Sequence, residues 1–554
     1  MSGILLLVCA TAVFAAAYFG YGRLLEKLLG TDPSRPTPAH SMRDGVDYVP
    51  AHPAVLFGHH FASIAGAGPI VGPIAAAYFG WGAVVAWVVL GCVFVGAVHD
   101  MASLHLSVRH GGRSIASVIE TVLGRPGKLL FLAFCWSTLV LVCAEFTRQV
   151  AVTFVHSPEV ATSSLLFIAL AVVFGLATAK GGVKVLPATL VAVPVMFFFV
   201  WLGTALPLDL QKLFGLSPEG AQTAWTLVLL AYCFLASTLP VWILLQPRDY
   251  LNSYLLYVMM ALGFLGVFAA APHVELDAFA GWRAPDAAGV PQPLFPILFV
   301  TIACGACSGF HALVASGTTA KQVASERHVR PVAYGGMLLE GVLAILALLA
   351  VGGFSQAELA PKLAAPGPVS LFAGGLASFC TKLGIPQQGG YTFMCLAVSA
   401  FLMTSVDTAT RLARFTWQEF WTKGVLSNMY FATALSVGLV ALLLLGNPEA
   451  AKTLWKVFAS ANQLLAGLTL FTASLWLYRN GRAWWVTLFP MLFMLAVSSC
   501  GLYLLCTGSW KAGNATLGVV TGVLLALAAV LVLLAITSLL RSRRHPPASS
   551  PLHS

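Results

Sequence analysis

The sequence predicts an all-α protein that crosses a membrane many times. Of its 554 residues, 59% are hydrophobic and only 9% are charged, whereas an average soluble domain has about 25% charged residues. Apolar runs of 18 or more residues recur from end to end, and each is long enough to cross roughly 30 Å of hydrocarbon. The period-2 alternation typical of a membrane barrel is absent. These observations predict a helical bundle and exclude a soluble enzyme with a solvated surface.

About 15 transmembrane helices are expected, separated by short polar breaks. Their approximate limits are 3–22, 53–77, 80–98, 128–155, 163–179, 184–206, 222–246, 250–272, 294–316, 332–354, 390–410, 426–446, 455–478, 483–506 and 517–540. The stretch 369–385 is apolar but rich in glycine, and we expect an interfacial or re-entrant helix there. No segment between the spans is long enough for a separate catalytic domain.

The distribution of basic residues orients these spans. If loop 23–52 is cytoplasmic, 22 of the 30 Lys and Arg residues fall on its side and eight on the opposite side, as the positive-inside rule requires. The first apolar run lacks a basic region before it, so it is expected to be a retained helix and not a cleaved signal peptide. The N-terminus is then periplasmic, and the long loop 273–293 is external. The basic tail 541–554 is cytoplasmic and expected to be disordered.

The charges and cysteines add little specific chemistry. The net charge of +10 comes from short loops between apolar runs, and no basic stripe of the kind that binds nucleic acid is formed. The eleven cysteines lie almost all in apolar segments, where they act as small packing residues. Cys304 and Cys307 form a C-x-x-C pattern, but it has no second pair.

The span 53–77 carries the strongest functional signal. Pro69 cannot donate a hydrogen bond to the carbonyl of Ala65, and Gly66 and Gly68 weaken the helix nearby. The sequence therefore predicts a helix broken near mid-membrane. Free N–H groups at the start of its second half would suit a substrate carboxylate, and freed carbonyls would suit a cation. The alternative is a kinked packing helix with small residues at a helix contact.

The span 222–246 repeats this theme. Ser237 and Thr238 precede Pro240, which frees the carbonyl of Ala236. The segment then continues into Arg248 and Asp249 at the expected cytoplasmic edge. Broken helices in corresponding positions of two halves indicate a transporter site, and these two spans are first and sixth of ten starting at residue 53.

The span 294–316 is dominated by small and hydroxyl residues, among them Ser308, followed by Thr318, Thr319 and Lys321. Tight packing explains the small residues but not His311.

Ionisable residues inside spans are costly and suggest function. Those expected inside spans are His59, His60, His99, Asp100, Glu145, Arg148, His311, Glu340 and Asp407. His99 and Asp100 fit a solvated helix cap almost as well, and Glu145 and Arg148 fit an ion pair on one helical face. We take these four, with Arg248, Asp249, Lys321, Glu340 and Asp407, as coupling or gating candidates.

Several long strings resemble the bacterial carbon starvation protein (CstA) family. They are AHPAVLFGHHFASIAGAGPIVGPIAAAYFGW (51–81), GAVHDMASLHLSVRHGGRSI (96–115), LPVWILLQPRDYLN (239–252), TIACGACSGFHALVASGTTAKQ (301–322) and FASANQLLAGLTL (458–470). The resemblance implies an inner-membrane transporter of peptides or a small carboxylate such as pyruvate, within the amino acid–polyamine–organocation superfamily. It also implies a five-plus-five inverted-repeat core.

On that basis the chain divides into four parts. They are an N-terminal helix and loop (1–52), a ten-helix transport core (53–415), about four accessory helices (416–540) and the tail (541–554). The substrate-binding residues are expected to be His59, His60, Gly66, Gly68, Pro69, Ser237, Thr238, Ser308 and His311.

The sequence favours a secondary transporter without an organic cofactor or metal. No G-x-x-x-x-G-K-[ST] motif is present, so nucleotide-driven pumping is unsupported. We expect a proton as coupling ion, because histidine exchanges protons near neutral pH and His59 and His60 precede the predicted break. The rival is Na⁺, held by Ala65, Ser308, Thr318 and Thr319.

Two other classes stay open at this stage. A channel needs a continuous polar path, which a single sequence does not exclude. A metal or haem protein would use His59, His60, His99 and His311 as ligands, but no H-E-x-x-H or C-x-x-C-H motif is present. The residues do not distinguish pyruvate from an amino acid or a peptide as the substrate.

Overall fold

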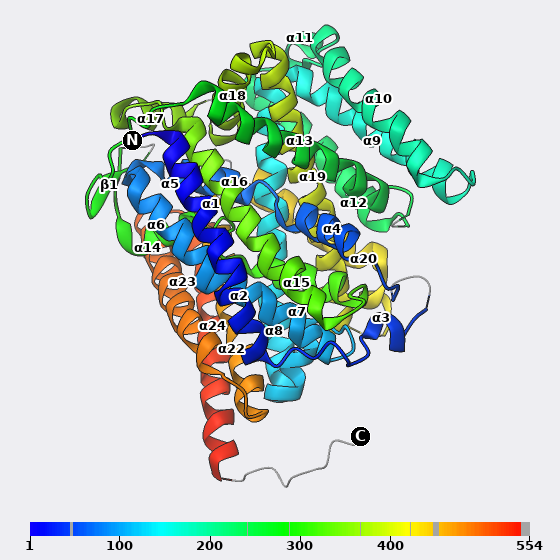
Figure 1. Ribbon diagram of the computed structural model, residues 1–554, viewed down its shortest axis with the longest axis vertical. Coiled ribbons are helices and arrows are strands. Elements are labelled where there is room, and N and C mark those ends of the chain that lie inside the picture. The colour runs from blue at the N-terminus through cyan, green and yellow to red at the C-terminus, as the bar shows by residue number, and fades with distance from the viewer. Residues whose placement is uncertain are drawn as a thin grey trace.

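The protein is a bundle of long helices (Figure 1), seen here in a computed structural model. The structure describes residues 1–44, 48–240, 242–286, 289–365, 367–421, 423–446 and 454–544. Within these ranges twelve helices are long and apolar enough to cross a membrane, and the bent pair 53–64 and 68–79 makes a thirteenth. The chain is therefore a multi-pass helical membrane protein, as predicted.

The first third of the chain contains α1 (Gly3–Phe19), α2 (Tyr21–Leu29), α3 (Pro38–Ser41), α4 (Pro53–Ile64), α5 (Gly68–Ala76), α6 (Trp81–Gly91), α7 (Ala97–Arg109), α8 (Ile115–His156), α9 (Pro158–Ala179) and α10 (Val185–Ala205). The middle contains α11 (Leu210–Phe214), α12 (Pro218–Thr238), α13 (Leu245–Ala270), β1 (Arg283–Pro285), β2 (Pro291–Pro293), α14 (Leu294–Thr301), α15 (Gly309–Gly317) and α16 (Gly335–Val351). The last part contains α17 (Gln356–Ala364), α18 (Pro368–Cys380), α19 (Gln387–Phe420), α20 (Met429–Leu445), α22 (Leu454–Arg479), α23 (Trp485–Lys511) and α24 (Ala515–Arg544).

Each of the fifteen expected spans has a helical counterpart, but three of them do not form one long helix. The span 53–77 is the bent pair α4 and α5, and 294–316 is the short pair α14 and α15. The span 426–446 is α20, with 17 residues. The number of membrane crossings stays a prediction.

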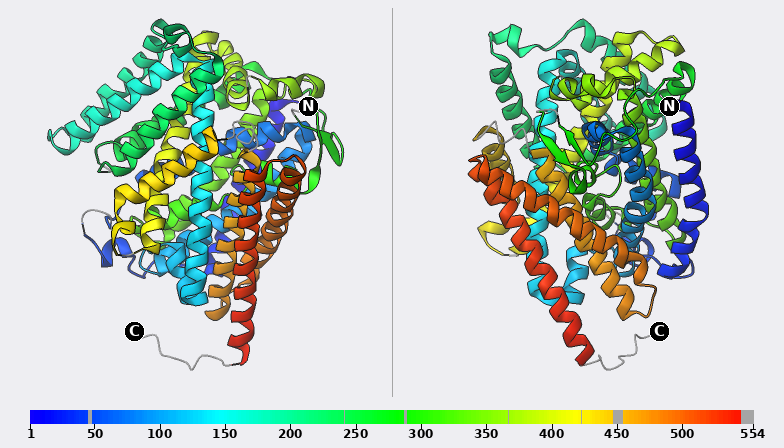
Figure 2. Two further views of the ribbon diagram at one scale, coloured as in Figure 1. Left: turned by 180° about the vertical axis from the view of Figure 1, so that it is seen from behind. Right: turned by 90° about the vertical axis from the view of Figure 1, so that its left-hand side faces the viewer.

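Contacts between loops define two faces of the molecule. The N-terminal face includes Met1, whose amino group donates to the carbonyl of Val274 at 3.1 Å, and Glu275, whose N–H donates to Gly352. The antiparallel pair β1 and β2 of loop 273–293 lies near that face (Figure 1). The C-terminal face includes Arg109, which forms an ion pair with Glu326 at 2.7 Å. Figure 2 shows the N-terminus and the described end of α24 at opposite ends of the molecule.

Proline and glycine shape the helices locally. In α8, Gly124 has φ 72° and ψ −176°, so the helix is kinked there, just before Pro126. The apolar part of α8 therefore begins after this kink, in agreement with the expected span 128–155. Two other helices contain a π-turn, at Cys92–Gly96 between α6 and α7, and at Arg330–Tyr334 before α16.

Two expectations for terminal and interfacial segments are refined. The helix α18 has 13 residues, a length of about 20 Å at 1.5 Å per residue. This is too short to cross the hydrocarbon, and α18 packs on α13, α16 and α19 beside the N-terminal face (Figure 1).

The tail was expected to be disordered from residue 541, but residues 541–544 continue α24. The rest of that tail lies outside the described residues.

Candidate functional site

The first break lies where the prolines and glycines predict it. Helix α4 ends at Ile64, α5 begins at Gly68, and the two axes differ by 45°. Every residue from 60 to 74 is buried. Because Pro69 lacks an N–H, α4 cannot continue through it. Two separate helices flank the break, so the span is broken and is not one kinked helix.

The second break lies in 302–308, between α14 and α15, and it faces the first. A Cβ at Gly68 would lie 2.3 Å from the Cβ of Cys304, and one at Gly72 would lie 2.9 Å from the carbonyl of Thr301. A Cβ added at Gly66 would lie 2.7 Å from the Ser405 hydroxyl oxygen of α19. Glycine is therefore required where the two broken helices touch.

This second break is not the one that Pro240 suggested. Helix α12 ends at Thr238 and α13 begins at Leu245, so Pro240 lies in the connection between two helices and not within one span. Ser237 and Thr238 are the last residues of α12. The Ser237 hydroxyl contacts Thr433 of α20 at 3.4 Å, and the Thr238 hydroxyl donates to carbonyls of its own helix. These hydrogen bonds do not reach the first break.

Helix α22 supplies the partners that the second break needs. Helix ends leave unpaired N–H and C=O groups, which are costly in a membrane. The Asn462 side chain accepts from the Phe310 N–H at 2.8 Å and donates to the Ser308 hydroxyl at 3.0 Å. Gln463 donates to the carbonyl of Phe299 at 2.6 Å. Neither amide was among the residues predicted to be functional, although an adjacent polar pair inside an apolar run was the available signal.

A buried network of acids and histidines lies beside the second break. Asp100 of α7 accepts from His99 Nδ1 and from His311 Nδ1, both at 2.8 Å. On its other side, the His311 Nε2 lies 3.3 Å from Glu340 Oε2 of α16. The four side chains are at most 1% exposed. The alternative of a solvated cap for His99 and Asp100 is therefore wrong.

The two adjacent histidines of α4 have different surroundings. His60 is fully buried, and its Nδ1 lies 2.9 Å from the Thr319 hydroxyl. This contact joins α4 to the turn that follows α15. His59 is only partly buried. The two histidines therefore differ in burial, and His60 is the one that contacts the segment after α15.

A second buried ion pair joins α13 to α19. Arg248 pairs with Asp407, and both side chains are 1% exposed. The Tyr232 hydroxyl of α12 donates to the same Asp407 carboxylate at 2.7 Å. Asp249 is also buried, and its Oδ1 has no hydrogen-bond partner among the described residues.

Two arginines of α19 hold the end of α12. Arg411 donates to the carbonyl of Ala236 at 2.8 Å, and Arg414 to that of Ser237 at 2.7 Å. The carbonyl of Ala236 is the one that Pro240 was predicted to free. These arginines therefore cap a helix end, and the partner of Asp407 is Arg248.

The remaining candidates lie elsewhere. Arg148 donates to Glu145 at 2.8 Å on α8, which is the ion pair that their spacing suggested. The Lys321 ammonium lies over the ring of Tyr48, 5.5 Å from its centre.

The proposed sodium ligands are not gathered at one point by the described contacts. The Ser308 hydroxyl is held by Asn462, the Thr318 hydroxyl donates to Val314, and Thr319 meets His60. Ala65 lies at the end of α4. Across the described ranges, no three His, Cys, Asp or Glu side chains are arranged to hold a metal ion.

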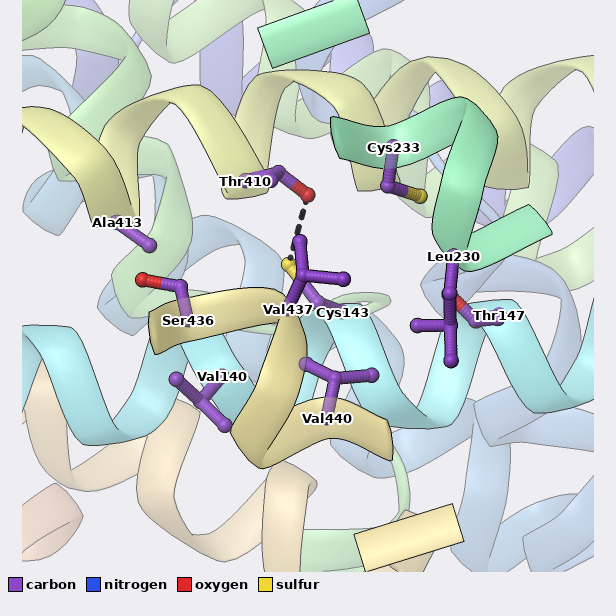
Figure 3. A pocket seen from close by; sticks show the side chains of 10 residues that line it. All are labelled: Val140, Cys143, Thr147, Leu230, Cys233, Thr410, Ala413, Ser436, Val437 and Val440. Carbon is purple, nitrogen blue, oxygen red and sulfur yellow. Dashed lines mark hydrogen bonds between the residues drawn. The ribbon is translucent and has the colours of Figure 1, made fainter. Parts of the chain in front are cut away.

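A small cavity between α8, α12, α19 and α20 lies apart from the breaks (Figure 3). Its volume is about 10 Å³, enough for about one water molecule. The side chains in Figure 3 are mostly apolar, and one hydrogen bond joins Cys143 to Thr410 at 3.3 Å. This cavity is too small for an organic substrate.

Comparison with known proteins identifies the family. The model of the family described as carbon starvation protein CstA matches residues 2–366 and 357–501. The peptide transporter CstA of Campylobacter jejuni is 32% identical, over 90% of this chain and 80% of its own. The peptide transporter CstA of Escherichia coli is 32% identical, over 88% and 79%. The pyruvate/proton symporter BtsT of Escherichia coli is 29% identical, over 91% and 81%. The resemblance seen in the sequence is thereby confirmed, and the chain belongs to the carbon starvation protein CstA family.

Proposed function

We propose that this chain is a secondary active transporter of the inner membrane that imports a peptide or a small carboxylate such as pyruvate together with protons. The observation that carries this proposal is the pairing of two broken helices, α4/α5 and α14/α15, beside a fully buried network of acids and histidines. Discontinuous helices at mid-membrane are the usual place of transporter sites. The relatives named as peptide transporters and as a pyruvate/proton symporter support these two substrate classes.

The order of elements supports an inverted-repeat core. The first half comprises α4/α5, α6/α7, α8, α12 and α13, and the second half comprises α14/α15, α16, α19, α20 and α22. In each half a broken helix comes first, a helix with a π-turn second and the longest helix third. Those longest helices are α8, with 42 residues, and α19, with 34.

This assignment changes the limits of the core. Its end moves from the expected residue 415 to 479, because α22 caps the second break. The hairpin of α9 and α10 becomes an insertion in the first half, and α23 and α24 are the accessory helices that follow the core.

A proton fits the described contacts better than Na⁺ as the coupling ion. The acids and histidines that can exchange protons lie together at the second break, whereas the hydroxyls of the sodium alternative are engaged separately. The C-terminal face, which carries the predicted excess of basic residues, is the cytoplasmic side in this proposal.

Uptake into proteoliposomes tests the proposal. Labelled pyruvate, alanine and trialanine are offered in turn. The vesicles carry either a pH gradient with the acidic side outside or an inwardly directed sodium gradient. We expect the pH gradient alone to drive accumulation of pyruvate or trialanine. Accumulation driven only by the sodium gradient would show that Na⁺, and not a proton, is the coupling ion. Passive equilibration under both gradients would contradict secondary active transport.

A further inference from the structure

His311 links three helices at the second break. It lies on α15, three residues after Ser308, which precedes the first turn of that helix. One ring nitrogen contacts Asp100 of α7 at 2.8 Å, and the other lies 3.3 Å from Glu340 of α16. The imidazole therefore bridges two carboxylates from different helices, in a place where none of the three side chains is more than 1% exposed.

The contact between His311 and Glu340 needs a proton. The Asp100 carboxylate accepts hydrogen bonds, so the His311 Nδ1 that faces it carries a hydrogen. The Nε2 then faces Glu340 Oε2. If both atoms lack a hydrogen, two lone pairs face each other, next to a buried negative charge. One proton between them, on either atom, turns this repulsion into a hydrogen bond.

No other group takes the place of that proton. Among the described residues, neither oxygen of Glu340 has a hydrogen-bond partner, and the Nε2 of His311 has none. An unpaired carboxylate is costly to bury. Losing the proton therefore removes the link between α15 and α16 and favours their separation or the entry of water.

The helices packed on α15 are α4, α7, α8 and α22, and the other titratable groups around this contact come from two of them and from nearby cysteines. Helix α7 contributes Asp100 and His99, and α4 contributes His60. The thiols of the neighbourhood are those of Cys92, Cys304 and Cys307. Helix α22 contributes the uncharged amide of Asn462. None of these groups lies within ion-pair distance of the His311 Nε2 in the described contacts, whereas Glu340 does.

We propose that His311 and Glu340 together form the binding site of the coupling proton, an inference that rests on the proton-coupled transport proposed above. The proton fastens α15, the helix that follows the second break, to α16. Its release frees α15. The His60–Thr319 contact connects α4 to the same region, so a change at this site reaches both broken helices.

The variants Glu340→Gln and His311→Asn test this site in proteoliposomes. Two readouts are compared: exchange of internal for external substrate without any ion gradient, and accumulation under a one-unit pH gradient at zero membrane potential. One pH unit is a tenfold ratio of proton concentrations, or about 1.4 kcal/mol. At zero membrane potential a symporter that carries one proton with each substrate therefore accumulates the substrate about tenfold. We expect both variants to lose this accumulation, and we expect Glu340→Gln to retain exchange while losing its pH dependence.

His105→Asn is the matched control. His105 is a fully buried histidine on α7, and it has no hydrogen bond to His311 or Glu340 in the described residues. It should keep the accumulation of the wild type. If either Glu340→Gln or His311→Asn fails to fold, the accumulation measured with the other variant still tests the site.

The outcomes separate the site from the function. Suppose that the wild type accumulates substrate and that a folded variant of His311 or Glu340 accumulates it equally, with unchanged pH dependence. The proposed proton site is then wrong, and the proposed function stands. If folded Glu340→Gln loses exchange as well, Glu340 belongs to the substrate site and the inference is overturned. If the wild type accumulates nothing in a pH gradient, the proposed function fails, and the proton site fails with it.

Discussion

At the scale of single residues, Arg248 and Asp407 show what a buried charge requires in this protein. Both side chains are 1% exposed, and the Tyr232 hydroxyl adds a hydrogen bond to the carboxylate. Taking two ions out of water is expensive, and their attraction offsets this cost only with good geometry and further hydrogen bonds. Removing one partner leaves an uncompensated charge. Removing both leaves neither of these two charges without its partner.

A double-mutant cycle on this ion pair should show a definite order of stabilities. Asp407→Leu should destabilise the folded protein by about 3–5 kcal/mol, because Arg248 is then buried without its partner. The double variant Arg248→Met/Asp407→Leu should recover most of that loss. Thermal unfolding in detergent measures both. Lys212→Ala, which changes an 86% exposed lysine, is the control and should leave the unfolding temperature unchanged. A double variant no more stable than Asp407→Leu would show that the two charges do not stabilise each other.

At the scale of elements, the two broken helices touch through glycine. A Cβ at Gly68 would lie 2.3 Å from the Cβ of Cys304, a distance that real contacts do not reach. Gly68→Ala should therefore force the two breaks apart and nearly abolish uptake, while membrane insertion stays normal. Adding Cys304→Gly removes the opposing atom and should restore part of the uptake.

Gly438→Ala is the control for this pair. Gly438 lies on α20 with no atom within 4 Å of an added Cβ, so its variant should transport normally. Uptake by Gly68→Ala equal to that of the wild type would show that the contact between the breaks is not needed for transport.

The first break was predictable from sequence and the second was not. Pro69 removes a backbone donor, and this local effect can be read without any contact information. The second break, 302–308, contains no proline, so small residues were its only signal. Pro240 has the same local effect as Pro69 but lies between two helices, and a sequence pattern cannot distinguish a connection from a broken span.

The network of His311 was only partly predictable. Asp100, His311 and Glu340 were candidates because charges inside spans are costly. Their meeting depends on the rotation and depth of three separate helices, α7, α15 and α16. A single sequence carries no information on these quantities. The capping role of Asn462 was missed for the same reason.

At the scale of the whole molecule, the two faces make the orientation testable. A cysteine at Trp282, which is 76% exposed, lies in the loop of β1 and β2, and one at Arg327 lies in the connection between α15 and α16. An impermeant maleimide added to intact cells should label Trp282→Cys and not Arg327→Cys, each compared with the parent protein. The reverse pattern would place the C-terminal face outside and overturn the direction of import.

The most direct test of the whole account measures protons together with substrate. Proteoliposomes that contain a trapped pH-sensitive dye receive pyruvate or trialanine without any initial ion gradient and without sodium. Proton-coupled import should make the lumen more acidic as the transported substrate enters, beyond any change in protein-free liposomes. Uptake of substrate with no acidification of the lumen would contradict it.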